Sequence, residues 1–141
     1  HVRHAAEAPA AYEPGQFFRR ELPHVLAALA ELPALPGVIV IDAHVWLGPG
    51  REGMGAHLYA ALDGRCAVVG IAKRPFRGAV EAAPVLRGAS ANPLYVSAAG
   101  MAPAVAASHV ERMHGPYRLP TLVKRADRLA RDAQVVRPWS Y

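Results

Sequence analysis

The chain has 141 residues, of which 52% are apolar and 19% are charged. This length suits one compact domain and excludes most multidomain architectures, and the apolar content excludes a chain too polar to fold. The 16 Lys and Arg residues outnumber the 11 Asp and Glu residues, giving a formal net charge of +5, and nearly all of these cations are arginine. Arginine pairs with phosphate oxygens, so the charge is compatible with a phosphate-bearing partner, although a solvated basic surface explains it as well.

The distribution of cysteine and apolar residues favours a cytoplasmic protein. Cys66 is the only cysteine, so no internal disulfide can form, and its apolar neighbours predict a buried, unreactive thiol. The most apolar stretch, residues 26–41, is interrupted by a charge, prolines and a glycine. It falls short of the ~20 apolar residues that a membrane span requires. We therefore expect no membrane partner.

The first part of the chain contains a helix and a buried strand. Residues 1–16 show no sustained hydrophobic period and are expected to form an extended segment and a loop. Apolar residues recur at helical spacing over residues 17–32, which predicts an amphipathic helix. Residues 38–41 are the β-branched run Val-Ile-Val-Ile. Continuous apolarity of this length predicts a strand buried on both faces, as in a parallel sheet flanked by helices.

The rest of the chain alternates strands and helices around glycine-rich loops. The patterns predict, in order, a glycine-rich loop at 48–53, a helix at 54–62, a strand at 66–71, a hairpin at 85–87 and 94–97, and helices at 102–113 and 121–134. This order predicts a single α/β domain over residues 17–134, with a mostly parallel central sheet flanked by helices, followed by a C-terminal tail at 135–141.

Two carboxylates and one lysine are the candidates for chemistry. Asp42 ends the strand at 38–41, and ligand sites of open α/β sheets gather at the carboxyl ends of strands. Glu21 lies in the first predicted helix, and two carboxylates from separate elements suit Mg²⁺, which adds water and phosphate oxygens. Lys73 follows the second strand and could reach a phosphate oxygen. Each has an ordinary alternative, since Asp42 could cap a loop, Glu21 could be solvated and Lys73 could only add solubility.

The sequence does not support several other common sites. The seven histidines have no metal-ligand spacing, the glycine-rich loop is not followed by Gly-Lys-Ser/Thr, and there is no Gly-x-Ser-x-Gly elbow. Aromatic residues interleave with arginine near the start, as in Tyr12, Phe17 and Arg19. This mixture suits stacking on unpaired bases and contacts to phosphate, although core packing is an alternative for Phe17.

Six short motifs occur in order along residues 12–131. They read YEPGQFFRRE at 12–21, VIVID at 38–42, GMGAHL at 53–58, GIAK at 70–73, PLYVS at 93–97 and YRLP at 117–120. In this order they resemble the endonuclease V family, Mg²⁺-dependent nucleases that act at deaminated adenine (inosine) in DNA or RNA.

The resemblance implies a ribonuclease H-like fold that lacks its first strands. It implies Glu21 and Asp42 as catalytic carboxylates that bind Mg²⁺, or Mn²⁺, and Lys73 as a catalytic cation that contacts phosphate. The implied partner is DNA or RNA, locally unpaired near a deaminated base, where Tyr12 and Pro14 would form a wedge between the strands. The residues expected to bind nucleic acid, from the resemblance and from the basic clusters, are Tyr12, Pro14, Gly15, Phe17, Arg19, Gly53, Met54, Lys73 and Arg74.

Departures from the family pattern bear on activity. The family's first catalytic Asp lies on an N-terminal strand, and none of residues 1–11 is a candidate for it. Ala43 replaces the glycine expected after Asp42, and Gly48 and Gly100 occupy positions of family histidines. We therefore expect weak or lost cleavage, with a catalytically inactive nucleic-acid-binding or scaffold module of the same fold as the alternative. Because the chain begins with His1, an upstream segment or a second chain is expected to complete the sheet.

Overall fold

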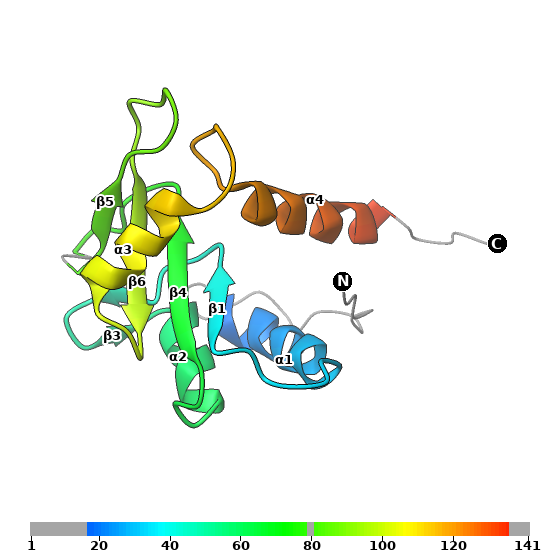
Figure 1. Ribbon diagram of the computed structural model, residues 1–141. Coiled ribbons are helices and arrows are strands. Elements are labelled where there is room, and N and C mark those ends of the chain that lie inside the picture. Colours follow the sequence, from blue (N-terminus) through cyan, green and yellow to red (C-terminus); the bar gives the residue numbers. More distant parts are fainter. Residues whose placement is uncertain (1–16, 79–80, 136–141) are drawn as a thin grey trace.

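The computed structural model describes residues 17–78 and 81–135 (Figure 1). The elements are α1 (Phe17–Ala30), β1 (Val38–Ile41), β2 (Trp46–Gly48), β3 (Arg51–Glu52), α2 (Met54–Ala61), β4 (Ala67–Ala72), β5 (Ala83–Val85), β6 (Leu94–Ala99), α3 (Pro103–Arg112) and α4 (Thr121–Val135). Each helix and strand predicted from the sequence is present, and its ends lie within two residues of the predicted ones.

The main sheet has the strand order β1-β4-β6-β5 and is mixed. β1 and β4 pair in parallel, with Ile41 opposite Gly70. β6 runs antiparallel to both β4 and β5, and β5 and β6 form the predicted hairpin. The α/β class is confirmed, but the prediction of a mostly parallel sheet was wrong. The apolar runs reflect helices on both faces of the sheet, and such helices bury a central antiparallel strand as fully as a parallel one.

Helices cover both faces of this sheet (Figure 1). On one face, α1 and α2 pack over a cluster that includes Leu58 and Val68, both fully buried. On the other face, α3 packs through Val110 against Val96. Cys66 is buried, as predicted, and desolvation by this burial raises the pKa of its thiol, against the smaller opposing effect of a backbone hydrogen bond from Ile39.

β1 is an edge strand, and only one of its faces is covered. Ile39 and Ile41 pack into the cluster beneath α1, whereas Val38 and Val40 are 45% and 39% exposed. The prediction that this strand is buried on both faces was wrong, because α3 crosses the sheet over β5 and β6 and does not extend to β1. Within residues 17–78 and 81–135, no strand pairs with the outer edge of β1.

The glycine-rich segment folds into a second, two-stranded sheet. β2 pairs antiparallel with β3, and Trp46 lies opposite Glu52. Gly50 has a φ of +65°, which a glycine adopts at the turn between them without strain. Strands of two and three residues are too short to produce a hydrophobic period, so the sequence indicated only a loop here.

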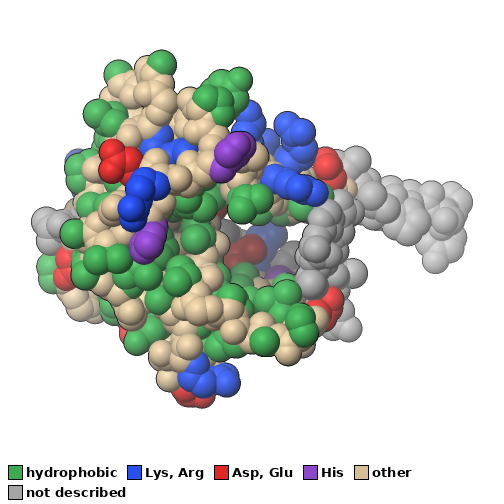
Figure 2. Space-filling view, viewed as in Figure 1, with side chains coloured by type: hydrophobic (Ala, Val, Ile, Leu, Met, Phe, Trp, Pro, Cys, Tyr) green, Lys and Arg blue, Asp and Glu red, His purple; other side chains and the backbone are tan. Residues whose placement is uncertain are grey.

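α4 projects from the body of the domain (Figure 1). Val123 packs at its start against the cluster beneath α3, whereas Leu122 is 65% exposed. Basic side chains gather over this helix in Figure 2, and the exposed ones are Lys124, Arg125, Arg128 and Arg131. In the described part of the chain, α4 included, no helix has the length and apolar character needed to cross a bilayer.

Candidate functional site

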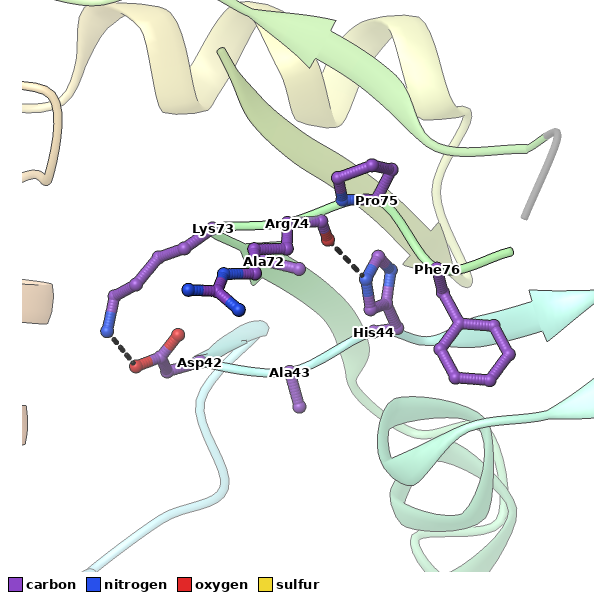
Figure 3. A pocket seen from close by; sticks show the side chains of 8 residues that line it. All are labelled: Asp42, Ala43, His44, Ala72, Lys73, Arg74, Pro75 and Phe76. Carbon is purple, nitrogen blue, oxygen red and sulfur yellow. Dashed lines mark hydrogen bonds and ion pairs between the residues drawn. The ribbon is translucent and has the colours of Figure 1, made fainter. Parts of the chain in front are cut away.

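Asp42 and Lys73 meet at one end of the main sheet (Figure 3). β1 and β4 are neighbouring parallel strands, so the residues that follow them reach the same edge. The Lys73 Nζ donates a hydrogen bond to the Asp42 Oδ2 over 3.0 Å. The two side chains are 39% and 37% exposed, and an ion pair this exposed contributes little to stability. The pair therefore contributes little to the stability of the fold, and its main effect is to position one positive and one negative charge at this edge of the sheet.

An open pocket of about 400 Å³ lies beside this ion pair. Its walls are residues 42–44, in the loop after β1, and residues 72–76, at the end of β4 and in the turn that follows (Figure 3). Lys73 and Arg74 supply positive charge, and Phe76 supplies an aromatic ring that is 37% exposed. The pocket thus combines cations with a ring face, which suits a ligand that carries both phosphate and an aromatic base.

His44 links the two segments that form the pocket. Its Nε2 lies 3.0 Å from the carbonyl oxygen of Arg74. Because a carbonyl only accepts hydrogen bonds, Nε2 carries the hydrogen of this bond. The other ring nitrogen, Nδ1, is buried and has no hydrogen-bond partner among the described residues. The ring also meets Phe76 edge-on, with 6.1 Å between ring centroids, so His44 holds the turn after β4 against the loop after β1.

The loop after Asp42 is fixed by close backbone crossings. The Ala43 carbonyl oxygen lies so near Gly70 that a Cβ at Gly70 would overlap it. Val45 is fully buried, its N–H donates to the Ser97 Oγ over 2.9 Å, and its carbonyl accepts from the Gly53 N–H over 2.8 Å. A Cβ at Gly53 would come 2.6 Å from the carbonyl oxygen of His44. Glycine at these positions therefore allows one protein segment to pack on another.

Two of the predicted charged residues lie on α1, outside the lining of the pocket. Glu21 has Arg20 as its ion-pair partner, with 3.8 Å between the Arg20 Nε and the Glu21 Oε1. Arg19 is exposed, and its guanidinium lies 5.9 Å from the centroid of the Phe18 ring. The pocket lining thus includes Asp42, Lys73 and Arg74 but not Glu21 or Arg19.

Gly53 and Met54, which were also predicted to bind nucleic acid, lie outside the pocket lining. Both are buried at the start of α2, beneath the loop after β1. Phe17 begins α1. Tyr12, Pro14 and Gly15 lie outside the described residues.

The described residues do not assemble a complete Mg²⁺ site. Asp42 is the acidic side chain of the pocket, and one of its oxygens is bonded to Lys73. In the described part of the chain, no three His, Cys, Asp or Glu side chains gather as a metal-binding group. Mg²⁺ requires a near-octahedral set of oxygen ligands, and the pocket supplies only the Asp42 carboxylate, one oxygen of which is bonded to the Lys73 ammonium. The residues of the pocket therefore do not complete the shell of a metal ion by themselves.

Sequence reasoning missed three residues of this region. Phe76 lies in the weakly patterned stretch after Lys73, where no periodicity pointed to a site. His44 belongs to no metal-ligand spacing or other motif, yet it is half-buried in the pocket wall. Arg118 donates to the carbonyl oxygen of Lys73 over 2.5 Å. Its only signal was its position in the motif YRLP, which gave no direction for the side chain.

Comparison with known proteins connects this geometry to one family. The family model described as Endonuclease V matches residues 1–89. An endonuclease V of Streptomyces avermitilis is 36% identical over 142 aligned positions, which cover 86% of this chain and 61% of that protein. The crystal structure of an endonuclease V from the same organism superimposes with a TM-score of 0.72 at 34% identity, covering 89% of this chain and 63% of that one.

A more distant relative was solved with nucleic acid. The endonuclease V of Ciona intestinalis, in complex with a 23mer DNA that contains an inosine followed by a ribo-adenosine, superimposes with a TM-score of 0.73 at 20% identity. This likeness covers 91% of this chain and 69% of that one, and at such identity it shows the fold alone. The chain spans less than two thirds of the length of the Streptomyces proteins that it matches.

Proposed function

Because the chain belongs to the endonuclease V family, we propose that it is an endonuclease V-like nucleic-acid repair protein that binds DNA or RNA beside inosine and cleaves it weakly or not at all. The observation that carries this proposal is the placement of Lys73, Arg74 and Phe76 around one open pocket next to Asp42. The cations would contact phosphate, and the ring would stack on an unpaired base. The inosine-containing DNA bound by the Ciona relative supports the choice of ligand. We propose the cytoplasm as its compartment.

Replacing Lys73 by glutamine is expected to weaken binding of a single-stranded, inosine-containing oligonucleotide. Loss of one phosphate contact lowers the slope of log K against log salt by about 1 and reduces affinity several-fold. Fluorescence anisotropy at a series of salt concentrations measures both quantities. Lys124→Gln is the matched control, because Lys124 lies on α4, with its Nζ 5.2 Å from the Tyr117 ring, and does not line the pocket. Equal losses in the two variants would mean that only net charge matters.

An oligonucleotide cleavage assay distinguishes weak activity from none. The substrate carries one inosine, and the reaction is run with Mg²⁺ or Mn²⁺. Metal-dependent cutting that disappears in Glu21→Ala and in Asp42→Ala would identify an enzyme in which these carboxylates act as ligands. Tight, salt-dependent binding without cutting would favour the alternative, an inactive binding module of the same fold. A chain that neither binds nor cuts would contradict both.

We also propose that an upstream segment or a second chain pairs with the outer edge of β1. That edge has no strand partner within the described residues, and Val38 and Val40 beside it are exposed. An unpaired apolar strand is a template for a further strand. Sedimentation at rising protein concentration separates the two sources, because only a second copy of this chain gives concentration-dependent dimers.

A further inference from the structure

A single guanidinium bridges the end of β4 and the start of β6. The Arg118 Nη2 donates to the carbonyl oxygen of Lys73 over 2.5 Å and to that of Pro93 over 2.7 Å. Lys73 directly follows β4 and Pro93 directly precedes β6, and these two strands are antiparallel neighbours. The Arg118 side chain is half-buried and is directed at the backbone of the pocket lysine instead of at solvent.

Arg87 in turn fixes the loop that carries Arg118. It is only 5% exposed, and its Nη1 donates to the carbonyl oxygens of Tyr117 over 2.8 Å and of Arg118 over 3.1 Å. Its other acceptors are the carbonyl oxygens of Glu111, Met113 and Gly115. Carbonyls at the C-terminal end of a helix carry partial negative charge, so the end of α3 stabilises a cation buried there. The loop at 113–118 is therefore held from inside the protein.

Lys73 has few other constraints. Its ion pair with Asp42 is more than one third exposed and is screened by water. A lysine side chain is a flexible four-carbon stem that does not hold one position unaided. The backbone of the turn is better fixed, because Arg118 binds the carbonyl of Lys73 and His44 binds the carbonyl of Arg74. The position of the Lys73 ammonium therefore depends on how this turn is held.

We propose that Arg118 is a positioning residue of the pocket, which fixes the turn after β4 so that the Lys73 ammonium lies beside Asp42, and that Arg87 fixes Arg118. The inference rests on the proposed function only in that nucleic acid gives Lys73 a phosphate to contact. Arg118 acts on the backbone of Lys73, so its effect on a ligand passes through Lys73. Lysine would replace it poorly, because its ammonium nitrogen lies one bond nearer the main chain than the Arg118 Nη2 that donates to both carbonyls.

Amine acetylation tests the positioning without any nucleic acid. Lys73 and Lys124 are the only lysines of the chain, so peptide mass spectrometry reports on Lys73 directly. In Arg118→Leu we expect Lys73 to be acetylated about three times faster than in the parent, as after loss of a half-exposed ion pair. The Asp42→Asn variant gives the acetylation rate expected for a Lys73 that has lost its ion pair. Arg125→Leu, which removes an exposed arginine of α4, should keep the parent rate.

The milder variant Arg118→Lys keeps the charge and should also increase the acetylation rate of Lys73. This variant provides the test if Arg118→Leu does not fold. An unchanged Lys73 rate in a folded Arg118 variant would overturn the proposal.

A double-mutant cycle tests whether Arg118 affects oligonucleotide binding through Lys73. Arg118→Leu should weaken oligonucleotide binding several-fold in the parent and have no further effect in a Lys73→Gln background, because both changes remove the same contact. Additive losses would overturn the positioning role. If the parent protein binds no oligonucleotide, the proposed function fails, while the acetylation rates still decide the role of Arg118.

Discussion

Replacing Gly70 by alanine is expected to lower the free energy of unfolding by about 3 kcal/mol, as for a core position that cannot accept a methyl group. Gly70 lies in β4 where the loop after Asp42 crosses the strand. The added Cβ would overlap the carbonyl oxygen of Ala43 and come 3.0 Å from the backbone nitrogen of Val45. Both neighbours are backbone atoms, which cannot rotate away as a side chain does. The loop or the strand must therefore shift, and Asp42 shifts with it.

Urea denaturation of Gly37→Ala provides the matched control for this change. Gly37 precedes β1, is exposed, and has nothing within 4 Å of the position of an added Cβ. Alanine there should be neutral or slightly stabilising, because it restricts the unfolded chain. Gly70→Ala should also lose affinity for the inosine oligonucleotide in proportion to the displacement of Asp42 and Lys73. Equal free energies of unfolding for Gly70→Ala and Gly37→Ala would contradict the close packing of the loop after Asp42 on Gly70.

Arg87→Met should destabilise the fold by about 3 kcal/mol, because it removes a buried donor group that several backbone carbonyls share. Methionine fills a similar volume, so the change tests hydrogen bonding more than packing. The carbonyls of Tyr117 and Arg118 would lose their donor in the interior. The end of α3 would also lose the cation that complements its dipole.

Arg112→Met is the corresponding control on the surface. Arg112 is exposed at the end of α3, and its Nε donates to the carbonyl oxygen of Ser108 over 3.2 Å. Its loss should cost no more than about 0.5 kcal/mol, as for most exposed positions. Thermal unfolding followed by circular dichroism compares the two variants. If both lower the melting temperature equally, Arg87 does not have the role that its buried hydrogen bonds indicate.

Most of the secondary structure could be predicted from the sequence, because helices and strands of this size leave a hydrophobic period. Strand direction could not. The run at 94–99 is buried on both faces by helices, and this burial carries no information on whether the strand is parallel or antiparallel. The exposure of Val38 and Val40 could not be predicted for a related reason. An apolar sequence shows that a strand can be buried, but it does not show whether a helix covers both of its faces.

The candidate site was predicted in part. Asp42 and Lys73 follow neighbouring parallel strands, so one rule about strand ends was enough to place them together. Arg87 and Arg118 were not predicted, because each binds carbonyls that are distant in sequence and no local pattern marks such a side chain. The predicted pairing of Glu21 with Asp42 as Mg²⁺ ligands, based on the two residue types and on the family resemblance, remains a prediction.

The anchoring of the loop after β1 bears on how this protein could be reconstituted. The contacts that fix residues 43–45 come from β4, from Ser97 in β6 and from the start of α2. None of these anchors lies on the outer side of β1. The loop beside the pocket is therefore fixed without any strand at that edge. If the proposed strand exists and is supplied as a separate polypeptide, it would need only to dock on β1, so the proposal can be tested by fragment complementation in trans.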